Sequence, residues 1–353
     1  MQLYRNLTPP PVFLGGGFLL RAGVVRNCYN NNMTAPVLAV RDLRVEFTVD
    51  KRTAAVLRGL SYSLEKGRVL AVVGESGSGK TVHALSLLQL LPPTAHISGG
   101  EILFNGKNLL SLSPSALRAV RGNKISMIFQ DPSASLNPVL SIGEQLTETL
   151  RAHRKISRPD ARREAVSLLS RVGIADAEKR LDEYPFQFSG GMCQRVMIAM
   201  ALALSPEVLI ADEPTTALDV TIQAQILGLV KKLQRAAGTA VVFITHNLAL
   251  AAQIADDVLV LYGGLCMEKA PAAELFARPL HPYTQGLLAS LASLNETREE
   301  LPAIAGNPPV AGECGAGCPF APRCKKAFDK CRANLPPLFE KDGRQVRCWL
   351  EEK

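Results

Sequence analysis

VLAVVGESGSGKTVHALSLLQLL, residues 69–91, is the stretch of sequence that decides the fold. Val69–Val73 is a short apolar run typical of a buried strand, and the glycine-rich residues 74–79 follow it. Thr81–Leu91 then has the pattern of a helix, which stops at two consecutive prolines. A strand, a glycine loop and a helix in this order predict an α/β nucleotide-binding unit.

Gly74–Thr81 fits the phosphate-loop pattern G-x-x-x-x-G-K-[ST] in full. Its glycines let backbone N–H groups turn toward a β-phosphate, and the start of the next helix adds positive potential. Lys80 is expected to reach the β- and γ-phosphates, and the Thr81 hydroxyl to coordinate Mg²⁺. A chance glycine turn is the minor alternative, because both flanking elements are present. The predicted ATP-binding residues here are Gly74, Glu75, Ser76, Gly77, Ser78, Gly79, Lys80, Thr81 and Val82.

A second apolar run, Val208–Ala211, ends in two carboxylates, Asp212 and Glu213. Open parallel sheets carry their ligands at the carboxyl ends of the strands. We therefore expect Asp212 to hold Mg²⁺ through its water shell and Glu213 to polarise the water that attacks the γ-phosphate. A solvated acidic pair that opens a loop is the alternative, and the phosphate loop makes it the minor one.

Strand-like and helical patterns alternate along the rest of the chain, which predicts a mostly parallel sheet. The strand-like ranges are 37–49, 55–64, 208–211 and 240–245, and the helical ones are about 136–181, 196–204 and 222–237. After Pro271 the sequence becomes rich in Pro, Gly and Cys, which marks a small C-terminal module.

The amino-acid composition limits the classes of protein to which the chain can belong. The chain has 353 residues, 47% apolar and 20% charged, which is the balance of a globular protein. The low aromatic content of 5% disfavours a base-stacking platform for nucleic acid, and the net charge of +8 carries little weight. No stretch reaches the roughly 18–20 apolar residues of a spanning helix. Pro11–Leu20 is short and glycine-rich, so we interpret residues 1–34 as an N-terminal extension rather than a signal peptide, and expect a cytosolic protein.

Phe188–Arg195 reads FSGGMCQR and resembles the LSGGQ signature of ABC-type ATPases. A serine, two glycines and a helix start present hydrogen-bond donors to a phosphate. In this family the signature serves the ATP bound by the opposite subunit, so the resemblance implies a dimer. The residues that it implies for ATP contact are Ser189, Gly190, Gly191 and Gln194.

Three more positions match the ABC pattern. Gln130 matches the glutamine that touches Mg²⁺ and the attacking water, and His246 matches the histidine that contacts the γ-phosphate. Ala217–Asp219 matches the loop that crosses the dimer interface. One feature is missing, because the family's adenine-stacking aromatic has no equivalent in Lys51–Ala55, and Phe47 is poorly placed. The resemblance implies Glu213, His246 and Gln130 as the catalytic residues.

The resemblance extends to the ATPase subunits of dipeptide, oligopeptide and nickel importers. Residues Met192–Gln225 are very similar to the dipeptide branch, and His281–Thr284 and Gly317–Cys324 resemble the tail of this group. It implies an ATPase that drives peptide uptake, with nickel or another small solute as alternatives. The rival class is a non-transport ABC-type ATPase acting on ribosomes or DNA, which tandem cassettes or a long coiled coil would mark.

The resemblance also implies architecture, partners and location. The expected fold has a parallel-sheet core, an antiparallel β subdomain, a helical subdomain at about 136–195 and a cysteine-rich C-terminal module. The expected domains are the extension 1–34, the ATPase domain 35–270 and the module 271–353. The implied partners are a second ATPase subunit of a different chain, two membrane permeases and an extracytoplasmic solute-binding protein, with no nucleic acid. The implied location is peripheral, at the cytoplasmic face of the inner membrane.

Five of the eight cysteines lie in the last 40 residues, which in a reducing compartment indicates a metal site rather than disulfides. Four thiolates can hold zinc or an iron–sulfur cluster, and the wide spacings fit a cluster better without deciding the matter. Some members of the resembling group carry a four-iron cluster here, which favours [4Fe-4S] over Zn. Reduced cysteines without metal are the third alternative. The proposed ligands are Cys318, Cys324, Cys331 and Cys348, with Cys314 as a spare.

Overall fold

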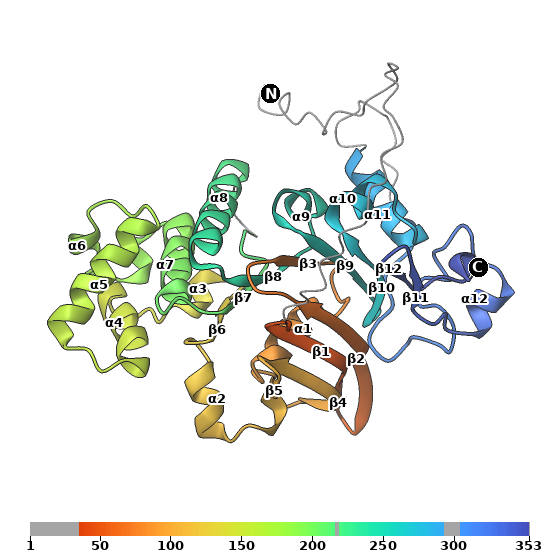
Figure 1. Cartoon of the computed structure of the whole chain (residues 1–353), viewed down its shortest axis with the longest axis horizontal. Coiled ribbons are helices and arrows are strands. Elements are labelled where there is room, and N and C mark those ends of the chain that lie inside the picture. Colours follow the sequence, from red (N-terminus) through yellow and green to blue (C-terminus); the bar gives the residue numbers. More distant parts are fainter. Residues whose placement is uncertain (1–34, 216–218, 293–303, 353) are drawn as a thin grey trace, which may run out of the picture. The chain divides into compact units, whose positions relative to one another are not determined.

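Strand β3 (Val69–Val73) lies inside an eight-stranded sheet of order β11-β12-β10-β9-β3-β8-β7-β6 in the computed structural model, which describes residues 35–215, 219–292 and 304–352. Strands β9, β3, β8, β7 and β6 are parallel, and β10, β12 and β11 continue the sheet in antiparallel pairing (Figure 1). Their bounds are β6 Ile125–Ile128, β7 Val208–Asp212, β8 Ala240–Thr245, β9 Asp257–Tyr262, β10 Leu265–Pro271, β11 Phe339–Lys341 and β12 Arg344–Val346. The predicted parallel core is confirmed.

A second, antiparallel sheet has the order β2-β1-β4-β5 and confirms the predicted β subdomain. Its strands are β1 Leu38–Val49, β2 Arg52–Leu64, β4 Ala95–Phe104 and β5 Lys107–Asn108. Helix α1 (Lys80–Leu87) shares one hydrophobic core with this sheet and with the large sheet. The helix is shorter than the predicted Thr81–Leu91, because the chain turns at Leu88 and Gln89 takes a positive φ of 51°.

The predicted helical region forms a bundle, which the chain inserts after strand β6 and before strand β7 in sequence. Its helices are α3 Pro132–Ser135, α4 Ile142–His153, α5 Arg158–Arg171, α6 Ala177–Arg180 and α7 Gly190–Leu202. Ser141 and Glu144 form a capping box at the start of α4. Apolar residues of α4, α5 and α7 pack with one face of the large sheet, so the bundle and the sheet share a hydrophobic core.

The remaining elements complete the described chain. They are α2 Pro114–Val120, α8 Val220–Ala237, α9 Leu248–Ile254, α10 Ala272–Ala277, α11 Pro282–Ala292, α12 Asp329–Ala333 and the 3₁₀ turns Leu109–Ser111, Pro185–Gln187 and Trp349–Glu351. The predicted N-terminal extension, 1–34, lies outside the described residues. None of the helices described here has both the length and the apolar character needed to cross a membrane.

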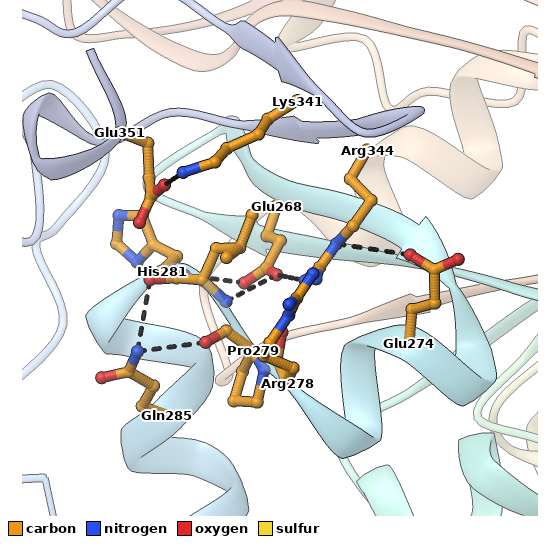
Figure 2. Close-up of polar contacts among 10 residues, drawn as sticks. Glu268, Glu274, Arg278, Pro279, His281, Gln285, Lys341, Arg344 and Glu351 are labelled. Atoms are coloured by element: carbon orange, nitrogen blue, oxygen red, sulfur yellow. Dashed lines mark hydrogen bonds and ion pairs between the residues drawn. The ribbon is translucent and has the colours of Figure 1, made fainter. Parts of the chain in front are cut away.

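The C-terminal residues are joined to the ATPase sheet, because β12 pairs with β10 and extends it. A buried ion pair fixes this junction: Arg344 Nη2 lies 2.7 Å from Glu268 Oε1, and the two side chains are 1% and 0% exposed (Figure 2). The Glu268 carboxylate also accepts the backbone N–H groups of Leu280 and His281. Charge-assisted bonds thus satisfy the Glu268 carboxylate, whereas Arg344 forms hydrogen bonds within the described chain through Nη2 and leaves its buried Nε and Nη1 without a hydrogen-bond partner. The domain boundary near residue 270 stays a prediction.

Candidate functional site

The phosphate loop leaves the carboxyl end of β3 and enters α1 at Lys80. Gly74 is required at the first loop position, because a Cβ there would lie 2.2 Å from the Leu261 carbonyl oxygen. Ser76 and Gly77 are exposed at the tip, and Val82 is partly buried in the first turn of α1. The first turn of α1 has no acidic residue and no side-chain cap, so its N–H groups are available to an anion.

Lys80 is held inside the loop. Its side-chain Nζ donates to the carbonyl oxygens of Gly74 at 2.8 Å and Glu75 at 2.9 Å, and the residue is 5% exposed. Burial lowers the pKa of its ammonium group, and the carboxylates of Glu213 and Asp212 act against this. Among the described residues, the buried Ser78 hydroxyl has no hydrogen-bond partner. The loop thus holds a positive charge where a phosphate is expected.

Asp212, the last residue of β7, faces the phosphate loop. The Thr81 hydroxyl donates to Asp212 Oδ1 over a long distance of 3.5 Å, and Asp212 is 1% exposed. The pKa of Asp212 is raised to about 6, because the rise caused by burial and by the Glu213 carboxylate exceeds the lowering by the Thr81 hydrogen bond and by Lys80. A carboxylate and a hydroxyl are hard oxygen ligands of the kind that Mg²⁺ prefers, so these two residues fit the predicted ion.

Glu213 turns sharply out of the sheet directly after β7. Its backbone has a φ of 46°, a strained value for a residue with a side chain, and its N–H donates to the Ile244 carbonyl at 2.9 Å. The Oε2 atom accepts from Gln130 Nε2 at 3.4 Å and lies 3.0 Å from His246 Nδ1. The Glu213 side chain is 11% exposed. The predicted catalytic residues Gln130 and His246 therefore both contact the third, Glu213.

Strand order explains why these three residues meet. Gln130 follows β6, Glu213 follows β7 and His246 follows β8, and these strands are parallel neighbours in the sheet. The carboxyl ends of neighbouring parallel strands share one edge, so residues 83 and 33 positions from Glu213 reach its carboxylate. This edge also holds Lys80 and Asp212, and it can bind a magnesium–triphosphate and orient a water molecule.

The signature segment begins helix α7. Ser189 is the N-cap, and its hydroxyl oxygen accepts the Met192 N–H at 3.3 Å. Ser189 and Gly190 are exposed, whereas Gln194 is only 1% exposed. The serine and glycine can thus face an outside ligand, but the Gln194 amide faces the protein interior. The sequence grouped Gln194 with the ATP contacts, and its burial does not support that role.

Comparison with known proteins identifies the family. The family described as "ABC transporter" matches residues 57–216, and the family described as "Oligopeptide/dipeptide transporter, C-terminal region" matches residues 267–331. The chain is 49% identical over 319 residues to the dipeptide transport ATP-binding protein DppD of Bacillus subtilis (strain 168), a match that covers 90% of this chain and 95% of that protein. The chain belongs to the ABC transporter ATP-binding proteins.

Two further likenesses agree with this membership. The oligopeptide transport ATP-binding protein OppD of Escherichia coli (strain K12) is 47% identical over 314 residues, covering 89% of this chain and 93% of that protein. The dimeric post-hydrolysis structure of the ATP-binding cassette MJ0796 bound to ADP and Pi has a TM-score of 0.60 at 26% identity, covering 67% of this chain and 98% of that one. The predicted P-loop ABC-type ATPase fold and the predicted ATPase class are confirmed.

Two features of this ABC ATPase stay open at the nucleotide site. Residues 217 and 218 of the predicted interface loop lie outside the described residues, while Asp219 caps helix α8 by accepting the Ile222 N–H at 2.9 Å. Phe47 pairs with Ala54 across the β1–β2 hairpin and packs against the core of the β subdomain. An aromatic partner for adenine therefore stays unassigned.

The four predicted cysteine ligands line one small apolar pocket together with His281 and Phe320. Gly317 allows this gathering, because a Cβ there would lie 2.5 Å from the Cys331 carbonyl oxygen. Burial raises the pKa of Cys318 and of Cys348 to about 11, so both thiols are protonated at neutral pH without a metal. Cys314 lies elsewhere, against Gly263.

The predicted metal is not confirmed. Across residues 35–215, 219–292 and 304–352, no group of three or more His, Cys, Asp or Glu side chains is close enough to hold a metal ion. Neither the predicted [4Fe-4S] cluster nor the zinc alternative therefore has support from the geometry of the described residues.

Two residues beside the phosphate loop were not among the predicted site residues. The Tyr283 hydroxyl oxygen accepts the Glu75 N–H at 3.0 Å, and Arg323 Nη1 lies 2.7 Å from Glu75 Oε2. Both residues stand in the tail motifs that resemble the importer group, but they lie 208 and 248 positions from Glu75. Nothing in the local sequence indicates these contacts.

Proposed function

We propose that this ABC ATPase is the ATP-hydrolysing subunit of an importer and couples hydrolysis to the uptake of di- and oligopeptides. The observation that carries the catalytic part is the Glu213 carboxylate, which lies 3.0 Å from His246 Nδ1 at the sheet edge beside Lys80 and Asp212. The peptide part is supported by the names and extensive coverage of the transport relatives DppD and OppD.

The chain's own groups divide the chemistry among them. Lys80 and the loop N–H groups bind the β- and γ-phosphates, and Thr81, Asp212 and Gln130 would hold Mg²⁺, which would neutralise phosphate charge. Glu213 orients the attacking water and accepts its proton, the role of a general base. His246 contacts the γ-phosphate and keeps the Glu213 carboxylate in position.

A second ATPase subunit, of a different chain, completes each site. Ser189, Gly190 and Gly191 contact the ATP held by that partner, and the exposure of Ser189 and Gly190 supports this arrangement. The dimeric state of the MJ0796 cassette supports pairing in general. A different partner chain, rather than an identical one, rests on the resemblance to the importer group.

Two membrane permeases dock on the helical region, and a solute-binding protein delivers peptide from outside. Large apolar side chains stand exposed there: Val139 and Phe186 are 76% exposed, and the Phe186 ring stacks on Tyr184 at 5.6 Å. Exposed apolar side chains in such a group are typical of an interaction surface. This docking would keep the ATPase at the cytoplasmic face of the inner membrane as a peripheral subunit.

The four cysteines that line the apolar pocket, Cys318, Cys324, Cys331 and Cys348, would hold the [4Fe-4S] cluster that we propose. The wide sequence spacings of the four cysteines and the resemblance to the importer group favour a cluster over zinc. Such a cluster would join distant parts of the C-terminal segment 271–353. Iron, zinc and sulfide analysis of anaerobically purified protein tests this, and protein with no iron and full occupancy of zinc would exclude the cluster.

Uptake by cells tests the transport function. Cells that lack the chain are supplied with the wild type or with Glu213→Gln, and the uptake of a labelled dipeptide and of labelled nickel is compared. We expect the wild type alone to restore dipeptide uptake. Restored nickel uptake with unchanged dipeptide uptake would assign the solute alternative. Normal uptake of both labels without the chain would favour a non-transport ATPase.

A further inference from the structure

The Glu75 residue of the phosphate loop is tied to the rest of the molecule through all three of its polar groups. Its N–H donates to the Tyr283 hydroxyl at 3.0 Å, and its carbonyl oxygen accepts from Lys80 Nζ at 2.9 Å. Its carboxylate pairs with Arg323 Nη1 at 2.7 Å. Two of these three partners come from residues after 271, far from the loop in sequence.

Arg323 is fixed much more firmly than a surface arginine. Its side chain is 7% exposed, and Nη1 also donates to the Tyr262 hydroxyl at 3.1 Å. Nε and Nη2 donate to the carbonyl oxygens of Ala305 and Ile304 at 2.9 and 3.2 Å. The guanidinium lies over the Tyr262 ring, 5.8 Å from its centroid. A guanidinium held this way keeps one position and imposes it on its partner.

Tyr283 is equally constrained. The residue is 0% exposed, and its ring packs against Tyr262 at 4.5 Å and Phe320 at 5.2 Å between ring centroids. Rotating or withdrawing the ring would disturb this aromatic cluster. The hydroxyl therefore presents a fixed acceptor to the Glu75 N–H.

Charge explains why the loop benefits from this contact. A carboxylate on the loop would repel the triphosphate that binds beside it, and the repulsion is strong where water is excluded. Pairing with Arg323 cancels the Glu75 charge and holds the Glu75 side chain against the C-terminal segment, to which Arg323 belongs. The Glu75 carbonyl, fixed by the same contacts, also helps to position the Lys80 ammonium.

From these contacts we infer that Arg323 and Tyr283 are positioning residues for ATP, so the C-terminal segment forms part of the nucleotide site. They act through Glu75 on binding and leave the hydrolysis step to the sheet edge. The inference rests on the ATPase activity of this family and does not depend on which solute is transported.

The decisive experiment compares charge variants of the full-length chain, assembled with its companion subunits, in nucleotide binding and in steady-state hydrolysis. Arg323→Gln should raise the Kd and KM for ATP about tenfold, with kcat within about twofold, because it leaves an unpaired carboxylate beside the phosphates. Glu75→Gln combined with Arg323→Gln should return the KM to within about threefold of wild type, since the repulsive charge is then gone. Arg323→Lys should fall between wild type and Arg323→Gln.

Lys341→Gln is the matched control, because it removes one positive charge of the same C-terminal segment where Lys341 pairs with Glu351 (Figure 2). It should leave both KM and kcat unchanged. Wild-type affinity in Arg323→Gln would overturn the inference, and so would a double variant that binds as weakly as the single one. If wild-type protein itself binds no ATP, the ATPase assignment fails instead.

Tyr283→Phe provides the second route if Arg323→Gln does not fold. It keeps the buried ring and removes only the hydroxyl that accepts the Glu75 N–H. We expect the KM for ATP to rise about fivefold, with little change in kcat, because a loop N–H loses its acceptor. An unchanged KM in a correctly folded Tyr283→Phe protein would contradict the positioning role.

Discussion

The carboxyl edge of the large sheet and the start of helix α7 both carry residues predicted to contact ATP, yet they are built differently. At the sheet edge, Lys80 and Asp212 are 5% and 1% exposed, and Glu213 contacts two neighbours. At the start of α7, Ser189 is exposed and bonds to its own helix. One half of the site is thus arranged within the chain, whereas the other half presents its groups outward, as a site shared between two subunits requires.

Glu213→Gln should abolish the function of the sheet-edge half of the site in hydrolysis without affecting ATP binding. The amide keeps the shape of the side chain but cannot accept a proton, so ATP turnover should fall about 10³-fold while ATP binding is preserved. The unhydrolysed ATP should then hold two subunits together, which size-exclusion chromatography with Mg-ATP would detect. Glu207→Gln is the control, because Glu207 precedes β7 at the opposite end of the same strand. Near-normal turnover in Glu213→Gln would refute the assigned role.

Lys80→Ala should break the same half one step earlier, at binding. The ammonium group is held by two loop carbonyls, and its loss removes the charge that receives the phosphates. We expect the affinity for ATP to fall about 100-fold, measured by titration with a fluorescent nucleotide. Lys66→Ala, which removes an exposed lysine before β3, should bind ATP normally. Equal affinities in the two variants would contradict the loop assignment.

Strand ends explain how far the sequence could predict this half of the site. Val208–Ala211 and residues 240–245 are uniform apolar runs, so their ends mark one sheet edge and bring Glu213 and His246 together. Gln130 follows β6, which has only four residues, and only the family pattern identified it. Tyr283 and Arg323 could not be predicted, because their contacts with Glu75 span more than 200 positions.

Helix geometry explains why the predicted contact of Gln194 with ATP lacks support. Gln194 stands five residues after Ser189, and at about 100° per residue it lies some 140° around the helix from it. Its side chain therefore joins the buried face of α7, next to Cys193 and Val196, while Ser189 stays exposed. A sequence signature by itself does not show which of its residues lie on the buried face of the helix and which on the exposed face, whereas the helical periodicity does.

Ser189→Ala should break the α7 half and leave the sheet edge intact. The hydroxyl is predicted to donate to the γ-phosphate of the partner's ATP, so hydrolysis by the assembled complex should fall about tenfold. ATP binding to the separate chain should not change. Ser157→Ala is the matched control, because Ser157 caps helix α5 in the same way, by accepting the Asp160 N–H. A similar loss in both variants would show that only helix capping was affected.

Asp212→Asn should show how much the buried Asp212 carboxylate destabilises the folded protein when no ligand is bound. Because the pKa of Asp212 is raised to about 6, the buried carboxyl group destabilises the folded state wherever it is ionised. The asparagine variant should therefore unfold at the same temperature as the wild type below about pH 3, where the carboxyl is mostly protonated in both the folded and the unfolded state. Its advantage should grow as the pH rises toward 6 and stay constant above, at about 3 kcal/mol at most. Melting curves without nucleotide or magnesium measure this difference, and Mg-ATP should reverse it by stabilising the wild type more. If the difference in unfolding temperature did not depend on pH, the Asp212 charge would already be balanced by other groups of the chain. The buried sheet edge would then carry no uncompensated charge, and in this respect it would not differ from the exposed start of α7.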